Sequence, residues 1–110
     1  ASAASGKSKL QVAEDAAKLA NTPRAYLDLS MQYYQAGKFD KCVEAGNEAV
    51  KLKPDFAAAY NNIGSAYNAM GKFAEGKAAL TKSLAIDPSS QLAKNNLAWA
   101  ESELKKAQTK

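Results

Sequence analysis

The sequence predicts an all-α protein, an α-solenoid of antiparallel helical hairpins with about six helices. Three observations lead to this fold class. Residues 57–90 repeat the pattern of residues 23–56 at a spacing of 34 residues. Within each copy the apolar and aromatic residues recur at the i, i+3, i+4, i+7 spacing of an amphipathic helix. Glycine and proline stand where they divide each copy into two helices, and a repeat of this length is typical of stacked hairpins.

The residues before the repeats are predicted to form a capping helix at 8–21, after a flexible tail at 1–7. One stripe of this helix is apolar and faces the stack, whereas the acidic and basic residues point away: Leu10, Ala13, Ala17 and Ala20 against Glu14, Asp15 and Lys18. The tail has no basic segment followed by an apolar one, so it is not a signal peptide as it stands. It is equally typical of a mature end left by cleavage or of residues added in a recombinant protein.

Each repeat unit, 23–56 and 57–90, reads as two helices joined by a tight turn. Gly37 and Gly71 end the first helices, because glycine adopts positive φ at the least cost. The second helices are predicted to run to Leu52 and Ile86, where Pro54 and Pro88 stop them. Thr22 followed by Pro23 is a helix start. The later helices are predicted to have N-caps at Asp55 and at Ser89 or Ser90.

After the repeats, residues 91–106 are predicted to form one further amphipathic helix, followed by a tail at 107–110. Its inward stripe is apolar and its outward stripe is charged: Ala93, Leu97, Ala100 and Leu104 against Lys94, Glu101 and Lys105. A helix with a polar outer side closes a repeat array, because each inner unit buries both of its faces.

Composition narrows the classes of function. The net charge of +4 comes from lysines at the two ends of the chain, and residues 23–90 are nearly neutral. One arginine and scattered lysines do not make the basic face of a nucleic-acid-binding protein, so no nucleic-acid partner is predicted. The apolar runs are too short to span a membrane, so no membrane insertion is predicted. The sequence leaves open whether the protein is cytoplasmic or periplasmic.

Residues for catalysis are absent from the sequence. There is no histidine, the commonest general base and metal ligand, and no glycine-rich phosphate loop. Cys42 stands at a packed position of a helix, which indicates a buried structural thiol. Glu101 and Glu103 are two residues apart and cannot share a helical face. The sequence therefore predicts a protein that is not an enzyme and has no cofactor and no metal site.

The 34-residue unit resembles the tetratricopeptide repeat (TPR), over residues 23–106. The residues that carry the resemblance are Tyr26, Tyr33, Gly37, Phe39, Ala49 and Pro54 in the first copy and Tyr60, Gly64, Tyr67, Gly71, Phe73, Leu80 and Pro88 in the second. Gly46 and Gly76 depart from the family pattern, and each costs about 1 kcal/mol of helix propensity. They indicate close helix packing or a small gap.

The resemblance implies an interaction module whose first helices line a concave groove for a peptide or a partner's helix. The partner-binding residues that it implies are Arg24, Leu27, Asp28, Met31, Tyr34, Asn61, Asn62, Ser65, Asn68, Asn95, Asn96 and Trp99. Further positions on the same groove wall are Gln35, Ala58, Ala69, Leu92, Ser102 and Glu103.

Asparagines are the unusual feature of this implied groove. A side-chain amide offers a donor and an acceptor, so it can bind a peptide backbone whatever the peptide's side chains are. Asn62 and Asn96 resemble the asparagine ladder of long TPR superhelices, and Asp28 interrupts that ladder in the first repeat. Asn61, Asn68 and Asn95 have an alternative role as solvated residues or as bridges between helices. Trp99 and Tyr34 are expected either to contact a ligand or to belong to the core.

Three further points complete the prediction. The TPR clamp for chaperone C-terminal carboxylates has five places, and only Asn62 matches here. The other four places are occupied by Leu27, Met31, Leu92 and Asn96, so no such clamp is expected.

A structural module that self-associates to form a homo-oligomer is an alternative function. A second alternative is a TPR segment of a larger bacterial membrane or secretion-associated protein, which the stretch "QLAKNNLAWAESEL" resembles.

Overall fold

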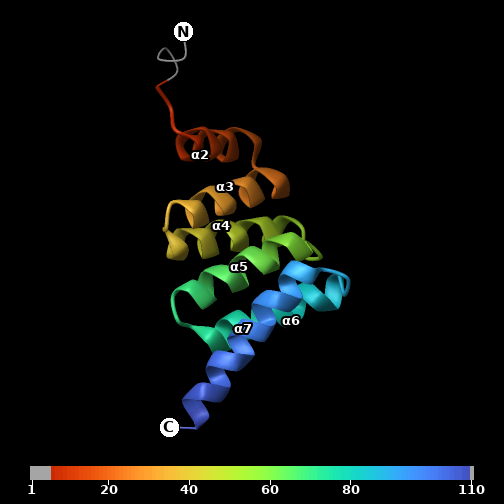
Figure 1. Cartoon of the computed structure of the whole chain (residues 1–110). Helices are drawn as coiled ribbons and strands as arrows, with labels where there is room; N and C mark the ends of the chain where they lie inside the picture. Colours follow the sequence, from red (N-terminus) through yellow and green to blue (C-terminus); the bar gives the residue numbers. More distant parts are fainter. Residues whose placement is uncertain (1–5, 110) are drawn as a thin grey trace.

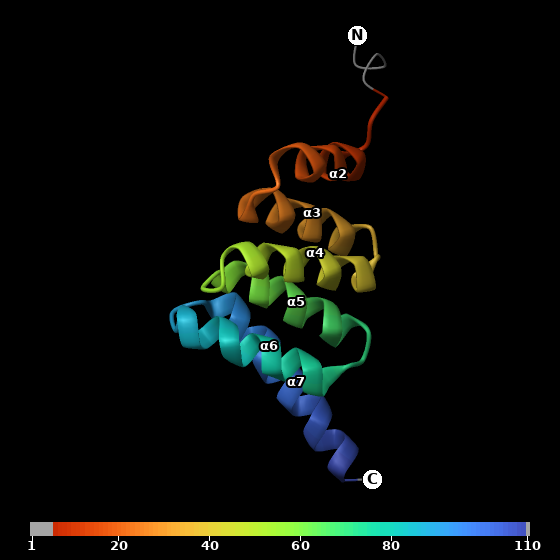
Figure 2. The same ribbon diagram turned by 180° about the vertical axis from the view of Figure 1, so that it is seen from behind.

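The computed structural model describes residues 6–109, which form six α-helices and no strand. The all-α solenoid of helical hairpins is thereby confirmed. Successive helices stack beside one another, and the two chain ends lie at opposite ends of an elongated molecule of 55 × 28 × 20 Å (Figure 1). The view from behind in Figure 2 shows α7 extending past the stack at the C-terminal end. The helices are α2 (Lys9–Ala20), α3 (Pro23–Gln35), α4 (Phe39–Leu52), α5 (Ala57–Ala69), α6 (Phe73–Ile86) and α7 (Gln91–Gln108).

Helix starts follow the predicted capping chemistry at two of three places. The Thr22 hydroxyl accepts a hydrogen bond from the Ala25 amide at 3.1 Å, and Ser90 does the same for Ala93 at 3.2 Å. The prediction for Asp55 is wrong. The N-cap of α5 is Phe56, which makes no side-chain capping bond. The Asp55 carboxylate lies instead 3.6 Å from the Lys53 ammonium.

The two turns inside the hairpins are closed in the same way, as the sequence predicts. Gly37 has a φ of 76° and Gly71 a φ of 79°. A methyl group added to either glycine would meet no atom within 4 Å, so glycine is needed for its backbone conformation and not for space. In each turn the following lysine amide donates to a tyrosine carbonyl at 2.8 Å, from Lys38 to Tyr33 and from Lys72 to Tyr67.

Small residues allow the helices to approach closely. Ala49, Ala59, Ala66 and Ala93 are fully buried between neighbouring helices. Gly46 and Gly76, which depart from the family pattern, also lie in close contacts, the first against Ile63 and the second against Asn68. The predicted close packing is therefore found at both glycines.

The two end helices differ from the prediction in detail. On α2, Ala13 and Ala17 are buried as predicted, but Ala20 is exposed. Glu14 does not point away: its carboxylate accepts a 2.7 Å hydrogen bond from the Tyr33 hydroxyl on α3. Burial and this carboxylate raise the pKa of Tyr33 to about 12.

At the C-terminal end, α7 buries Ala93 and Ala100 and runs two residues past the predicted end at 106, to Gln108. Residues 1–5 and 110 of the predicted tails lie outside the described residues, whereas Gly6 and Lys7 are described and non-helical. In the part of the chain from 6 to 109, no helix combines the length and apolarity that crossing a membrane requires.

Candidate functional site

A groove of about 250 Å³ opens on the side of the stack formed by α3, α5 and α7, the first helix of each unit. None of its eight lining residues carries a charge, and four of them are asparagine or glutamine. We call this hollow the amide groove. Its lining residues are Met31, Tyr34 and Gln35 of α3, Asn61, Asn62 and Ser65 of α5, and Leu92 and Asn96 of α7.

The apolar part of the amide groove is exposed. Met31 is 43% exposed, Tyr34 38% and Leu92 61%, although all three are large hydrophobic side chains. The Tyr34 ring packs against Phe39 in a T-shaped arrangement, with ring centroids 5.2 Å apart and an interplanar angle of 68°. Apolar surface left open beside polar groups is typical of a binding site.

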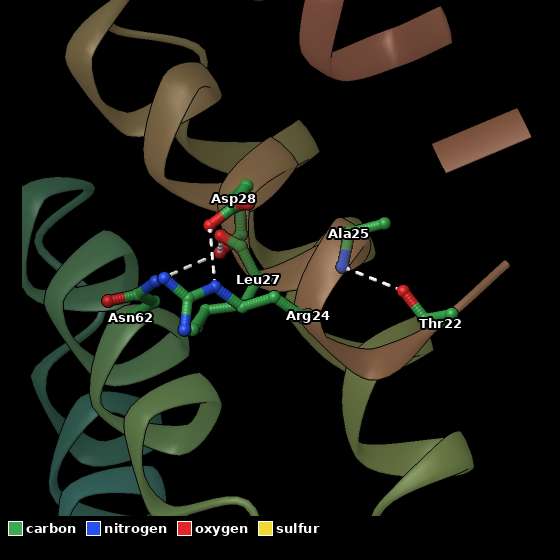
Figure 3. Close-up of polar contacts among 7 residues, drawn as sticks. Thr22, Arg24, Ala25, Leu27, Asp28 and Asn62 are labelled. Atoms are coloured by element: carbon green, nitrogen blue, oxygen red, sulfur yellow. Dashed lines mark hydrogen bonds and ion pairs between the residues drawn. The ribbon is translucent and has the colours of Figure 1, made fainter. Parts of the chain in front are cut away.

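The Asn62 amide is held by a buried serine. Its nitrogen Nδ2 donates to Ser30 Oγ at 2.9 Å, and the Ser30 hydroxyl donates to the Leu27 carbonyl at 2.8 Å. Figure 3 shows the Asn62 nitrogen directed towards α3 and its oxygen pointing away from these contacts. Ser30 is fully buried, so this orientation of Asn62 is supported from inside the protein.

The Asn96 amide is held by two groups of α5. Its Nδ2 donates to Ser65 Oγ at 2.9 Å and to Asn61 Oδ1 at 3.1 Å. The Ser65 hydroxyl in turn donates to the Asn61 carbonyl at 2.9 Å. This network joins α5 to α7 across the amide groove.

The structure brings half of the twelve predicted site residues together in this lining. They are Met31, Tyr34, Asn61, Asn62, Ser65 and Asn96, and the remaining two lining residues, Gln35 and Leu92, were also predicted on the groove wall. Asn61 is nevertheless only 7% exposed, and its Oδ1 accepts the hydrogen bond from Asn96.

Two predicted positions are corrected, because their side chains are buried and lie outside the lining. Leu27 is 7% exposed and packs with Ala49 and Ala59 in the core. Asn68 is 1% exposed, and its Nδ2 donates to the Asn96 carbonyl at 3.0 Å. Asn68 is therefore a bridge between α5 and α7, the alternative role considered for it.

The other four predicted residues lie outside the lining. Arg24 and Asp28 form an exposed ion pair of 3.2 Å on α3 (Figure 3). Asn95 accepts a hydrogen bond from Gln91 along α7. Trp99 is 43% exposed and packs against Phe73, with ring centroids 5.8 Å apart.

Sequence reasoning missed the role of Ser30. The helical pattern of the sequence does not show that the Ser30 hydroxyl meets an amide from the next repeat. The signal available in the sequence was a hydroxyl at a position where the second repeat has Gly64.

The described residues offer little reactive chemistry. Burial raises the pKa of the Cys42 thiol to about 12, so the thiolate is not formed near neutral pH. Between residues 6 and 109, no three His, Cys, Asp or Glu side chains are grouped so that they could hold a metal ion.

Comparison with known proteins agrees with this fold. A family model described as "TPR repeat" matches residues 32–71, and one described as "Tetratricopeptide repeat" matches residues 57–90. The small glutamine-rich tetratricopeptide repeat-containing protein 2 of Mycosarcoma maydis is 27% identical over 84 residues, which cover 76% of this chain and 24% of that protein. Heat shock protein STI1 of Saccharomyces cerevisiae is 30% identical over 84 residues, 74% of this chain and 14% of that protein.

Among solved structures, the first TPR of Spaghetti (RPAP3) bound to the HSP90 peptide SRMEEVD has a similar fold. The TM-score is 0.83 at 23% identity, over 87% of this chain and 77% of that one. The chain thus spans a quarter or less of the two curated relatives and most of this structural neighbour. Its 34-residue repeat, its stacked hairpins and the two family matches, which together cover residues 32–90, show that the chain belongs to the tetratricopeptide repeat family.

Proposed function

We propose that this chain is a non-catalytic protein-interaction module that binds a peptide segment of a partner protein in the amide groove. The observation that carries the proposal is the lining itself. Exposed apolar side chains stand beside asparagine amides whose orientation is held by hydrogen bonds from within the protein. Apolar surface provides affinity, and pre-oriented polar groups lower the entropic cost of binding a peptide backbone.

The comparisons support a peptide as the class of partner. The first TPR of RPAP3 was solved with the HSP90 peptide SRMEEVD, which contains two glutamates and an aspartate. An acidic peptide of that kind does not match the amide groove of this chain. Carboxylates are bound by Lys and Arg side chains, and none of the eight lining residues of the amide groove is basic.

The test is a screen of a random peptide library against the wild-type protein and an Asn62→Ala/Asn96→Ala variant. The matched control is Asn47→Ala/Asn95→Ala, which removes two exposed asparagines outside the lining. All three proteins are first checked for equal helicity and melting temperature, because the groove amides also join helices.

We expect enriched peptides to bind the wild type and the control alike, and to bind the groove variant at least fivefold more weakly, the effect of about one hydrogen bond. A library that yields no binder, or binders indifferent to the groove variant, would show that the amide groove is not the binding site.

Self-association is a second candidate, favoured by the outward side of α2. Val12 is 55% exposed and Leu19 88%, and the exposed Ala16 lies between them on the same stripe. Light scattering over a range of protein concentrations tests this function. A molar mass that rises with concentration, and that Leu19→Lys keeps at the monomer value, supports association through α2. A constant monomer mass excludes it.

A further inference from the structure

We infer that the amide groove selects a partner segment that presents backbone N–H donors and an apolar side chain, and that has no carboxylate where it enters the groove. This inference rests on the proposed function and specifies the chemistry of the partner. It follows from the direction in which the asparagine amides point, from the absence of basic residues among the eight lining residues and from the exposed apolar lining.

The direction of the Asn62 amide follows from hydrogen counting at Ser30. A hydroxyl has one proton to donate, and the Ser30 proton goes to the Leu27 carbonyl. Ser30 Oγ can therefore only accept from Asn62, so the Asn62 nitrogen must face Ser30. Its oxygen Oδ1 faces the opposite way, accepts no hydrogen bond from the described residues and is not sealed from solvent.

The same counting applies to Asn96. The Ser65 proton goes to the Asn61 carbonyl, so Ser65 Oγ accepts from Asn96. The second hydrogen of Asn96 Nδ2 goes to Asn61 Oδ1. Both donor positions of this amide are occupied, and its oxygen, like that of Asn62, has no donor from within residues 6–109.

The amide groove thus presents two carbonyl oxygens whose orientation is supported by buried or bridging serines. An incoming peptide N–H can donate a hydrogen bond to such an oxygen. An ionised carboxylate cannot, because it has two acceptor oxygens and no proton to donate. A peptide backbone carries such N–H donors, so it matches this lining.

Charge around the amide groove supports the same partner. None of the lining residues is basic, and the guanidinium of Arg24 on the adjoining surface is already paired with Asp28. A buried carboxylate without a cation would lose its hydration with no compensation. The large exposed side chains of Met31, Tyr34 and Leu92 provide a place for an apolar side chain instead.

An amide-to-ester scan tests the direction of the hydrogen bonds. In the tightest peptide from the library, each backbone N–H is replaced in turn by an ester oxygen. We expect one or two positions to lose binding by about five- to tenfold on the wild type, and to lose nothing on Asn62→Ala/Asn96→Ala. An ester scan with the same profile on both proteins would overturn the inference.

Charge is tested with the same peptide carrying Glu in place of its apolar anchor, with a free carboxyl end. We expect this acidic peptide to bind the wild type at least tenfold more weakly, and Leu92→Lys to recover part of the loss. Groove-dependent binders that are acidic would overturn the inference and leave the proposed function standing. Peptides that bind the Asn62→Ala/Asn96→Ala variant as tightly as the wild type would overturn the proposed function itself.

Discussion

The two hairpins, α3–α4 and α5–α6, have the same lengths of 13 and 14 residues and the same turns, but they fill their central contacts in opposite ways. In the second hairpin, Leu80 of α6 is fully buried against Gly64 of α5; a methyl group on Gly64 would lie 2.5 Å from Leu80 Cγ. In the first hairpin the equivalent of Leu80 is Gly46. Its space is filled by Ile63 of the next repeat, whose Cγ1 would lie 2.5 Å from an added methyl group.

The comparison teaches that the space beside each glycine is filled by a large side chain, but that a different helix supplies this side chain in each case. A bulky side chain from α6 serves the contact inside the second hairpin, whereas one from α5 serves the contact between the hairpins. Gly46 therefore leaves no void, although it departs from the family pattern. Interiors are packed to nearly uniform density, so space left by one helix must be taken by another.

The same exchange shapes the amide groove. Asn68 and Tyr34 occupy equivalent positions, 34 residues apart. Asn68 is buried because Gly76 on α6 leaves room for its side chain. In the first hairpin the equivalent of Gly76 is Cys42, which fills that room itself and is fully buried. Tyr34 stays in the groove beside Met31 and Gln35, so the apolar lining contributed by the hairpins comes from the first, and their asparagines come from the second.

The largest effect is expected at Leu80. We expect Leu80→Ala to lower the free energy of unfolding by about 3 kcal/mol, because it leaves a cavity beside Gly64. Urea denaturation measures this loss. Adding Gly64→Ala should restore part of it, since the new methyl group enters the cavity, whereas Gly64→Ala alone should cost about 2 kcal/mol by overpacking. Losses that simply add in the double variant would mean that the two residues do not share this space.

Helix ends, turns and the side of the stack that carries the groove could be predicted from the sequence. Gly37 and Gly71 have the predicted conformation, the second helices end at Leu52 and Ile86, and the period of 34 places Asn62 and Asn96 on one side. These features depend on local chemistry and helical spacing, which a single sequence displays directly.

The burial of individual side chains and the direction of the asparagine amides could not be predicted, because they depend on the residues that the neighbouring helices place in contact with them. Asn68 is buried only because α6 offers Gly76 and α7 offers the Asn96 carbonyl. Glu14 turns inward because α3 presents the Tyr33 hydroxyl. The spacing within one helix contains none of this information.

The next effect concerns Gly76, whose equivalent in the first hairpin is Cys42. We expect Gly76→Ala to lower the free energy of unfolding by about 1–2 kcal/mol, because the new methyl group would enter the space held by the Asn68 side chain. In an Asn68→Ala background most of that cost should disappear, since alanine removes the obstructing amide and favours the helix. A full cost in both backgrounds would show that Asn68 is not the obstacle.

The last effect is an alkaline slope that belongs to the first hairpin. Burial raises the pKa of Cys42 from 9.0 to about 12, so above pH 9 the unfolded chain releases its thiol proton while the folded chain keeps it. The unfolded state then binds fewer protons, and the free energy of unfolding must fall as the pH rises from about 9 towards 12.

Tyr33, whose pKa is raised from 10.0 to about 12, adds a fall of the same sign. Urea denaturation at several pH values should show a shallower decline for Cys42→Ala than for the wild type, because the contribution of the thiol is removed. Gly76→Ala, which changes the equivalent position of the second hairpin, is the matched control and should keep the wild-type slope. Equal slopes for the wild type and Cys42→Ala would mean that the thiol reaches solvent in the folded protein, and the tight filling of the first hairpin would have to be abandoned.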